Sequence, residues 1–351
     1  MRSAPPEVVA TWPKPNYIDP QSQGPDLIVA GLFTLMVALI CLGLRLYIRL
    51  GVMRKTEMDD WVMVVATIFS AAATLSIVLG FAQYGWRHHV WDLTLEQLIA
   101  GRKASFVTQF LFIPATMLTK ISILLSYLRL APQNSLFRRL SLTAPWIIAL
   151  ATAAFWIVLF TECRPLTSYW NLGHAARDCI DETPVLFSYA IATVIFDFFV
   201  WALPLPTIYR INLPLSQRLA LIALFSVGLC VVAAAAVRIH YLDIVVRQTY
   251  DVTWEGTHLW MWVAVEANLG IICGCVPWLK ALVKSWRKRG DSSVTGSHGD
   301  TLGHARPDGM KTISSKGAFR MESLPGAQGT TGAREKGKYI DLESSYTPSE
   351  P

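Results

Sequence analysis

The sequence predicts an all-α fold, a polytopic membrane protein built as a seven-transmembrane helix bundle. Three observations predict this class. The 351-residue chain is 53% hydrophobic and 16% charged, with a mean hydropathy of +0.39. Its apolar residues gather in seven stretches, each close to the roughly 20 residues that a helix needs to cross a bilayer. Short polar loops separate these stretches. Because lipid offers no partner for backbone amides, each stretch is expected to be helical.

The predicted spans divide the chain into three parts. Residues 1–26 form an external polar tail, residues 27–284 form the seven-helix membrane domain, and residues 285–351 form a cytoplasmic tail. The first part is proline-rich and lacks the pattern of a cleavable signal peptide, so the first span is expected to act as a signal anchor. The last part has too little apolar surface to offset its conformational entropy and is predicted to be disordered. The spans are placed at 27–47, 61–81, 104–127, 144–163, 185–208, 219–242 and 259–283.

Basic residues near the span ends predict the orientation, because short cytoplasmic loops carry an excess of Lys and Arg. One side carries Arg49, Arg54, Lys55, Arg129, Arg138, Arg139, Arg210, Arg218, Lys284, Arg287, Lys288 and Arg289. The other side carries Arg2, Lys14, Arg87, Arg102, Lys103, Arg164, Arg177 and Arg247. The first side has more, so the N-terminus is predicted outside and the C-terminus cytoplasmic. This topology accounts for much of the net charge of +6 and gives no ground for a nucleic-acid partner.

Two cysteines, Cys163 and Cys179, bracket the predicted external loop after the fourth span. An oxidising outer face favours a disulfide between them, the alternative being two free thiols. The Cys273 and Cys275 pair lies in an apolar span without a companion pair, so no metal site is predicted. The cysteines within the predicted spans are expected to behave as small apolar residues.

Four ionisable residues fall inside the predicted spans, namely Lys120, Asp197, Arg238 and Glu266. A charge at membrane depth costs at least roughly 2.5 kcal/mol unless it finds a partner or water. Asp197 lies near the bilayer midplane, where the long stem of Lys120 can reach it. Arg238 and Glu266 both lie toward the outer side. We expect two interhelical ion pairs. They either fix the helix order or line an outer polar cavity, formed by the third, fifth, sixth and seventh spans, that accepts a small ligand.

Adjacent carboxylates open the second predicted span at Asp59 and Asp60. Carboxylates at a helix N-terminus cap free backbone amides and interact favourably with the helix dipole. Two acids exceed what a cap requires, so an ionic lock with Arg49 or Arg129 at the inner face is the second interpretation. Under that interpretation, Asp60→Asn alters basal signalling more than protein level.

Several short motifs together resemble the fungal rhodopsin-domain family of integral membrane proteins. They are Asp59-Asp60-Trp61, Gly85 to His89, Lys120 to Leu130, Cys163-Arg164-Pro165 with Tyr169-Trp170 and Cys179, Asp197 with Leu203-Pro204, Arg238, and Glu266 with Pro277. The resemblance covers about residues 27–284. It implies a receptor-like protein or a membrane protein encoded in a secondary-metabolite gene cluster, and it implies the plasma membrane as the location. The cysteine-rich external domain of some receptor-like members is not expected, because the first cysteine is Cys41.

The sequence therefore favours a receptor-like protein that senses a small ligand and contacts a cytoplasmic signalling partner. No cofactor is predicted, because Lys280 lies too near the inner end of its span for a retinal Schiff base. Common catalytic motifs such as Gly-x-Ser-x-Gly are absent. The alternative is an accessory protein of specialised metabolism. It would be either a transporter or a cyclase or isomerase in which Asp197 and Glu266 donate protons.

Overall fold

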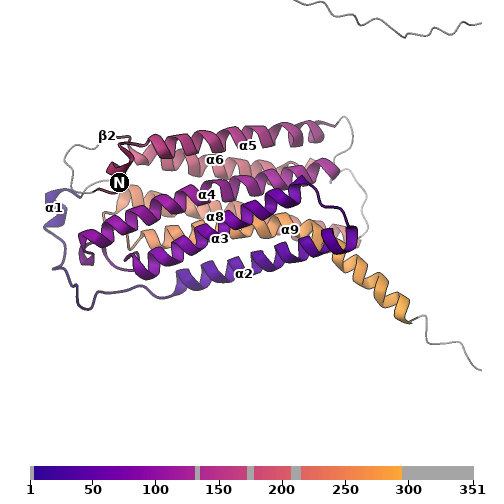
Figure 1. Cartoon of the computed structure of the whole chain (residues 1–351), viewed down its shortest axis with the longest axis horizontal. Helices are drawn as coiled ribbons and strands as arrows, with labels where there is room; N and C mark the ends of the chain where they lie inside the picture. Colours follow the sequence, from indigo (N-terminus) through magenta and orange to yellow (C-terminus); the bar gives the residue numbers. More distant parts are fainter. Residues whose placement is uncertain (1–3, 131–134, 172–177, 207–214, 295–351) are drawn as a thin grey trace, which may run out of the picture. The chain divides into compact units, whose positions relative to one another are not determined.

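The computed structural model describes residues 4–130, 135–171, 178–206 and 215–294, and helices dominate it (Figure 1). Seven of the described helices are long and apolar enough to cross a membrane, which confirms the predicted all-α membrane bundle. The N-outside orientation remains a prediction. The α-helices are α1 (Pro6–Val9), α2 (Asp26–Tyr47), α3 (Met58–Gln83), α4 (Leu95–Leu130), α5 (Leu136–Thr161), α6 (Glu182–Ala202), α8 (Leu215–Asp243) and α9 (Gly256–Val294).

The helix bounds differ from the predicted spans mainly in α4, α6 and α9. Helix α4 begins at Leu95 instead of residue 104, because its first turns carry polar side chains that hydropathy assigns to a loop. Helix α6 ends at Ala202 instead of residue 208, shortly before Pro204, which has no amide to donate. Helix α9 continues to Val294 instead of residue 283. The rest of the predicted tail, residues 295–351, lies outside the described residues.

Helices α4 and α9 form the centre of the bundle. Helix α4 packs on α3, α5, α6 and α9, and α9 packs on α2, α3, α4 and α8. The largest hydrophobic core includes Phe112, Ile113, Met117 and Leu124 of α4 together with Val263 of α9. The two central helices are therefore the ones whose polar residues have the least access to lipid or water.

One end of the bundle, which we call the disulfide end, gathers the connections 84–94 and 249–255 and the described parts of a third connection, 162–171 and 178–181. It holds the antiparallel strands β1 (Cys163–Arg164) and β2 (Asp178–Cys179) and the short helices η2 (Val90–Asp92) and η3 (Leu166–Tyr169). The π-helix η4 (Ile244–Gln248) extends α8 toward the same connections.

The N-terminal segment is not a free tail over its described part. The backbone amide of Asn16 donates to Asp92 Oδ1 over 2.9 Å, and the amide of Gln23 donates to the carbonyl of Arg87 over 3.0 Å. The side chain of Gln23 also donates to the Trp254 carbonyl over 2.8 Å. Residues 16–23 thus lie across the connections of the disulfide end, which the prediction of a polar tail did not include.

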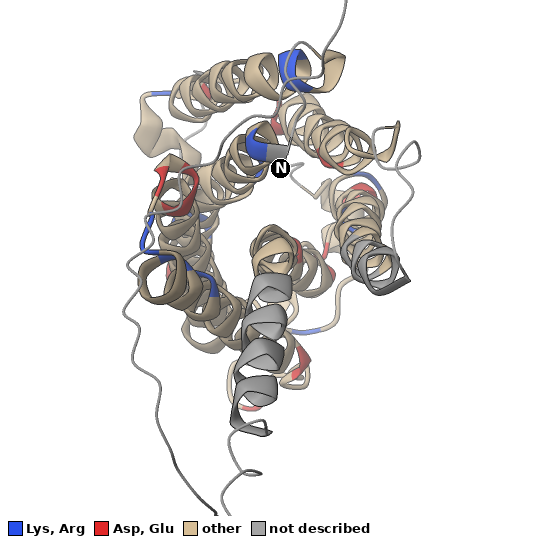
Figure 2. Ribbon diagram, turned by 90° about the vertical axis from the view of Figure 1, so that its right-hand side faces the viewer, with Lys and Arg blue, Asp and Glu red and all other residues tan. Residues whose placement is uncertain are grey.

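The opposite end of the bundle, which we call the η1 end, begins where α2 passes into the π-helix η1 (Ile48–Met53). The chain then turns through Arg54, whose φ of 49° is left-handed, and enters α3. Figure 2 views the bundle along its helices from this end, with acidic and basic segments of the ribbon close together.

Candidate functional site

The four ionisable residues predicted inside the spans form two buried ion pairs. Lys120 Nζ lies 3.1 Å from Asp197 Oδ1, joining α4 to α6. Arg238 Nε lies 2.5 Å from Glu266 Oε2, joining α8 to α9. All four side chains are at most 8% exposed. These are the two interhelical ion pairs that we expected, because a charge inside a membrane needs a partner.

Both pairs leave part of their bonding capacity unused. Among the described residues, Asp197 Oδ2, Arg238 Nη2 and Glu266 Oε1 are buried and have no hydrogen-bond partner. We call these three the open atoms. A buried polar group without a partner costs roughly 1–3 kcal/mol, and more when it is charged. Such atoms are candidates to receive a ligand, a water molecule or a proton.

A cavity, which we call the disulfide-end cavity, opens among α4, α5, α6, α8, η4 and α9. Its volume is about 100 Å³. Most of its wall is apolar and includes Phe112, Ile113, Phe155, Leu186 and Val263. The polar residues in its wall include Gln109, Tyr169, Glu182, Tyr189 and Arg238. An apolar cavity with a few converging polar groups is the usual form of a small-molecule site.

A second, smaller cavity of about 40 Å³, the central cavity, lies further from the disulfide end. Its polar wall residues include Thr116, Thr119, Lys120, Asp197 and Glu266. Helices α4, α6, α8 and α9 enclose it. These correspond to the third, fifth, sixth and seventh predicted spans, which are the spans expected to form the ligand cavity.

The two cavities meet at a layer that we call the partition, formed by Arg238, Glu266, Thr116 and Tyr189. Arg238 lines the disulfide-end cavity and its partner Glu266 lines the central cavity. The hydroxyls of Thr116 and Tyr189 share a hydrogen bond of 2.9 Å. The Arg238 guanidinium also lies 5.7 Å from the ring centroid of Tyr189. An event in one cavity can therefore act on the other through the Arg238–Glu266 pair.

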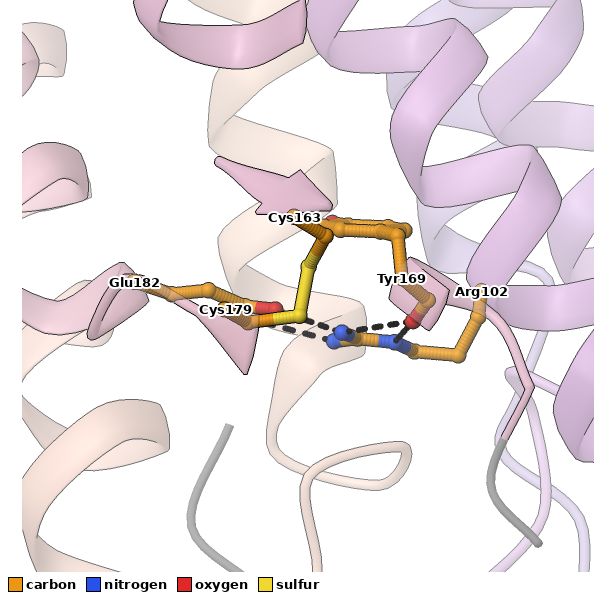
Figure 3. The surroundings of a disulfide bond; sticks show 5 residues. All are labelled: Arg102, Cys163, Tyr169, Cys179 and Glu182. Atoms are coloured by element: carbon orange, nitrogen blue, oxygen red, sulfur yellow. Dashed lines mark hydrogen bonds and ion pairs between the residues drawn. A yellow bond between two sulfur atoms is a disulfide. The ribbon is translucent and has the colours of Figure 1, made fainter. Parts of the chain in front are cut away.

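The predicted disulfide joins Cys163 of β1 to Cys179 of β2, and we call these two strands together with η3 the cap (Figure 3). Beside it, Arg102 Nη2 lies 2.5 Å from Glu182 Oε1 and donates to the Tyr169 carbonyl over 3.1 Å. Tyr169 and Glu182 both line the cavity. The disulfide and the Arg102 bonds therefore fix two of the cavity's polar wall residues.

Glu162 lies directly after the α5 span, next to this cap, and is 3% exposed. Burial is the largest cause that raises the pKa of Glu162; with the negative charge of Glu182 also raising it and Arg102 lowering it, the pKa is about 7. A carboxyl with this pKa changes its charge near neutral pH, which makes the cap sensitive to pH.

The acids at the start of α3 belong to a dense cluster at the η1 end, which we call the arginine cluster. Asp59 Oδ2 lies 2.7 Å from Arg45 and 3.4 Å from Arg49, and Asp59 Oδ1 pairs with Arg129. Asp60 Oδ1 lies 3.0 Å from Arg45, and Asp60 Oδ2 lies 3.2 Å from Arg49. Both of the predicted partners, Arg49 and Arg129, are present, and Arg45 joins them.

The same residues also cap the helix. Glu57 is the N-cap of α3, and Asp60 accepts a hydrogen bond from the Glu57 amide in a reciprocal capping box. Asp59 instead serves the arginines and accepts from Ser126 Oγ over 2.9 Å. Capping and ion pairing therefore coexist, and the switching role of a lock remains a prediction.

Sequence reasoning missed three residues that contribute to the polar interior. Arg45 is 0% exposed and lies inside the first predicted span, so the rule that selected the other ionisable residues also applied to it. The ring of Trp278 lies 3.7 Å from the Arg49 guanidinium, a contact without a sequence signal. Asn268 is 0% exposed, accepts from Ser70 Oγ over 2.9 Å and donates to Thr34 Oγ1 over 3.1 Å.

The sequence assigned no cofactor or metal to any of these sites. In the described part of the chain, no three His, Cys, Asp or Glu residues are grouped so that they could hold a metal ion. The side chain of Lys280 lies outside the described residues.

Seven membrane-length helices, with two buried ion pairs between them, define a polytopic integral membrane protein with a polar interior. The chain belongs to the fungal rhodopsin domain family, whose domain it matches over residues 44–285. The resemblance drawn from its motifs is thereby confirmed.

Three relatives have names that indicate two kinds of role. The chain is 24% identical to "Receptor GIN3" of Arthrobotrys oligospora, over 89% of this chain and 72% of that protein. It is 24% identical to "Fugralins biosynthesis cluster protein 2" of Gibberella zeae, over 77% of this chain and 68% of that protein. It is 21% identical to "Polyenoic acids biosynthesis gene cluster protein Ba17b" of Metarhizium anisopliae, over 68% of each.

Proposed function

We propose that this chain is a receptor-like membrane protein whose disulfide-end cavity binds a small, mostly apolar ligand on the outer side of the plasma membrane. The observation that carries the proposal is the partition. The partition contains an ion pair between α8 and α9; one partner lines each cavity, and each partner has an open atom. A ligand that contacts Arg238 acts directly on the packing of α8 against α9.

Movement at the partition reaches the η1 end through α9. This helix carries Glu266 at the partition and Trp278 beside the arginine cluster. Under the predicted orientation the η1 end faces the cytoplasm, where a signalling partner would read the change. A ligand shifts such an equilibrium only by its differential affinity for the two states, so contact with Arg238 must differ between them.

Two names among the relatives support the proposal. One relative is called a receptor, and it is matched over most of this chain. Another is named for polyenoic acids, which are lipophilic molecules with a polar end. A molecule of that kind fits an apolar wall that ends at an arginine.

A cavity-filling variant tests the receptor function in the native host. Val263 lines the disulfide-end cavity and is 5% exposed, so Val263→Trp places an indole where the ligand would lie. Leu229→Trp is the matched control, because Leu229 is 53% exposed on a helix that faces lipid. A strain deleted for the gene receives the wild-type chain or either variant, and its transcript response to external cues is measured.

The proposal expects Val263→Trp to blunt the response at normal protein level and Leu229→Trp to leave it intact. An unchanged response with Val263→Trp would overturn the receptor function.

The alternative is an accessory protein of a specialised-metabolite pathway. Two relatives are named for biosynthesis clusters, and two of the open atoms are carboxylate oxygens that could hold a proton. Metabolite profiling of the same strains separates the two functions. Loss or accumulation of one metabolite, together with product formation by purified protein that Asp197→Asn or Glu266→Gln abolishes, supports an enzyme. Intact metabolites with a blunted transcript response support the receptor.

A further inference from the structure

We propose that the ligand of the disulfide-end cavity is a lipophilic carboxylic acid in its ionised form, and that its carboxylate replaces Glu266 as the counter-ion of Arg238. This inference rests on the proposed function, because it names the ligand class of the same cavity. It adds a chemical event at the partition, which is the exchange of an internal carboxylate for an external one.

The donor set of Arg238 favours a carboxylate. A guanidinium presents five N–H donors in a planar fork that a carboxylate can engage through two parallel hydrogen bonds. Here Nε donates to Glu266 Oε2 over 2.5 Å, while Nη2 is an open atom. Arg238 is also the member of the pair that lines the disulfide-end cavity. Arg238 therefore offers both a positive charge and an unused N–H donor to a ligand in the disulfide-end cavity.

The wall of the cavity favours a hydrocarbon chain. Phe112, Phe155, Leu186 and Val263 surround the space beyond Arg238 and offer no hydrogen bond from their side chains. Burial of apolar area contributes about 25 cal/mol per Å², which suits an acyl chain. Glu182 also lines this wall, but Arg102 lies 2.5 Å from it and offsets its charge. A lipophilic acid thus matches both ends of the cavity.

Glu266 is placed to act as the competitor of such a ligand. Its Oε2 occupies Arg238, while its open atom Oε1 belongs to a residue that lines the central cavity together with Lys120. When a carboxylate takes Arg238, the released Glu266 still shares a cavity with a cation. The four charges Lys120, Asp197, Arg238 and Glu266 sum to zero, so a bound anion leaves one negative charge in excess. Removing the charge of Glu266 removes that excess.

The test uses the full chain in nanodiscs of zwitterionic phosphatidylcholine at pH 8, with radiolabelled decanoate as the probe. Binding is measured at equilibrium and corrected with empty nanodiscs, and unlabelled decan-1-ol and methyl decanoate are the competitors. We expect saturable decanoate binding and at least tenfold weaker competition by the two neutral compounds.

Three variants decide the role of the ion pair. Glu266→Gln is expected to tighten decanoate binding severalfold, because the internal competitor is gone. The double variant Arg238→Gln with Glu266→Gln leaves no unpaired charge and is expected to bind decanoate no better than decan-1-ol. Glu96→Gln makes the same change of charge at an exposed residue outside the cavity wall and is expected to leave the affinity within twofold. Monodispersity and helical content confirm that each variant is folded.

Each of the other outcomes contradicts one part of the proposal. If Glu266→Gln weakens decanoate binding, Glu266 positions Arg238 and the exchange of counter-ions is wrong. If the three compounds bind equally and Val263→Trp abolishes the binding of all of them, the cavity of the proposed function stands but the acid class is wrong. If none of them binds above empty nanodiscs, both the ligand class and the proposed cavity fail for alkyl ligands.

Discussion

Asp59 at the η1 end and Glu266 at the partition are both almost fully buried carboxylates, 1% and 2% exposed, but their surroundings differ. Both oxygens of Asp59 contact arginines, and one also accepts from Ser126. Glu266 has one arginine on one oxygen, and its other oxygen is an open atom beside a cavity. Burial alone therefore does not distinguish the two carboxylates, whereas the number of their oxygens that have a partner does.

The same contrast extends across the bundle. Between α2, α3 and α9, Asn268 uses its oxygen and its amide nitrogen in hydrogen bonds to Ser70 and Thr34. Between α4, α6, α8 and α9, the open atoms lie beside the two cavities. We interpret the first side as a clamp that fixes the helices and the second as the side that responds to a ligand.

Breaking the arginine cluster is expected to have the largest effect. Asp59→Asn leaves Arg45, Arg49 and Arg129 short of one counter-charge in a buried site, which should cost roughly 3–5 kcal/mol of stability. Thermal unfolding of the detergent-solubilised protein measures the loss. Asp243→Asn is the control, because Asp243 is 33% exposed and its pair with Arg247 should contribute at most about 1 kcal/mol. Equal stability of the two variants would remove the structural role of the cluster.

Removing the disulfide is expected to have the next largest effect. Replacing Cys163 and Cys179 by Ser opens a loop closed over a sequence separation of 16 residues, which costs about 3 kcal/mol in the chain-entropy model. The variant should have a lower unfolding temperature than the wild type. Reductant should lower the unfolding temperature of the wild type by a similar amount and should not change that of the variant. Cys230→Ser, at an exposed free cysteine, should change neither value. If both thiols of the wild type react with a label before reduction, the bond is absent.

Exchanging the charges of the Lys120–Asp197 pair tests whether these two residues are coupled. Lys120→Asp or Asp197→Lys alone should lower the stability, because each change places two like charges side by side in a buried site. The double exchange should recover most of that loss in the same unfolding assay. A double variant that folds no better than either single variant would show that the two residues are not coupled.

The smallest effect concerns Glu162 and depends on pH. Its folded pKa of about 7 lies above its ordinary value of 4.5, so between these pH values the folded state keeps a proton that the unfolded state has released. Stability therefore falls as pH rises through this window. Glu162→Gln should be more stable than the wild type at pH 8 and equal to it near pH 4.5, as measured by unfolding temperature. A difference that does not depend on pH would contradict the assignment to this carboxyl.

Much of the fold follows from the sequence because lipid imposes one rule on every span. The first predicted span, 27–47, differs from α2 by one residue at its start. The start of α4 was missed because Arg102 and Lys103 lie in a helical region that hydropathy assigns to a loop. The packing of residues 16–23 across the disulfide end was missed because it consists mainly of backbone hydrogen bonds, which leave no pattern in the side chains.

The sequence predicted the charged residues of the candidate site, but it did not predict which of their atoms lack a hydrogen-bond partner. Lys120, Asp197, Arg238 and Glu266 stand out because a charge in lipid needs a partner. The unused capacity of Arg238 Nη2 depends on how the helices are rotated, and the sequence does not specify that rotation. The contact of Trp278 with Arg49 depends on the same rotation and on the register of α9.

The most direct measurement compares Glu266→Gln with Asp60→Asn in the native host, recording the amount of folded protein and the transcript response per folded molecule. The account predicts that Glu266→Gln alters the response per folded molecule, because the partition is the responsive element, even though the loss of the Arg238 counter-ion lowers the amount of protein. It predicts that Asp60→Asn lowers the amount of protein with an unchanged response per molecule. The reverse result, in which Asp60→Asn changes basal signalling at a normal protein level, would contradict the account and make the arginine cluster the switch.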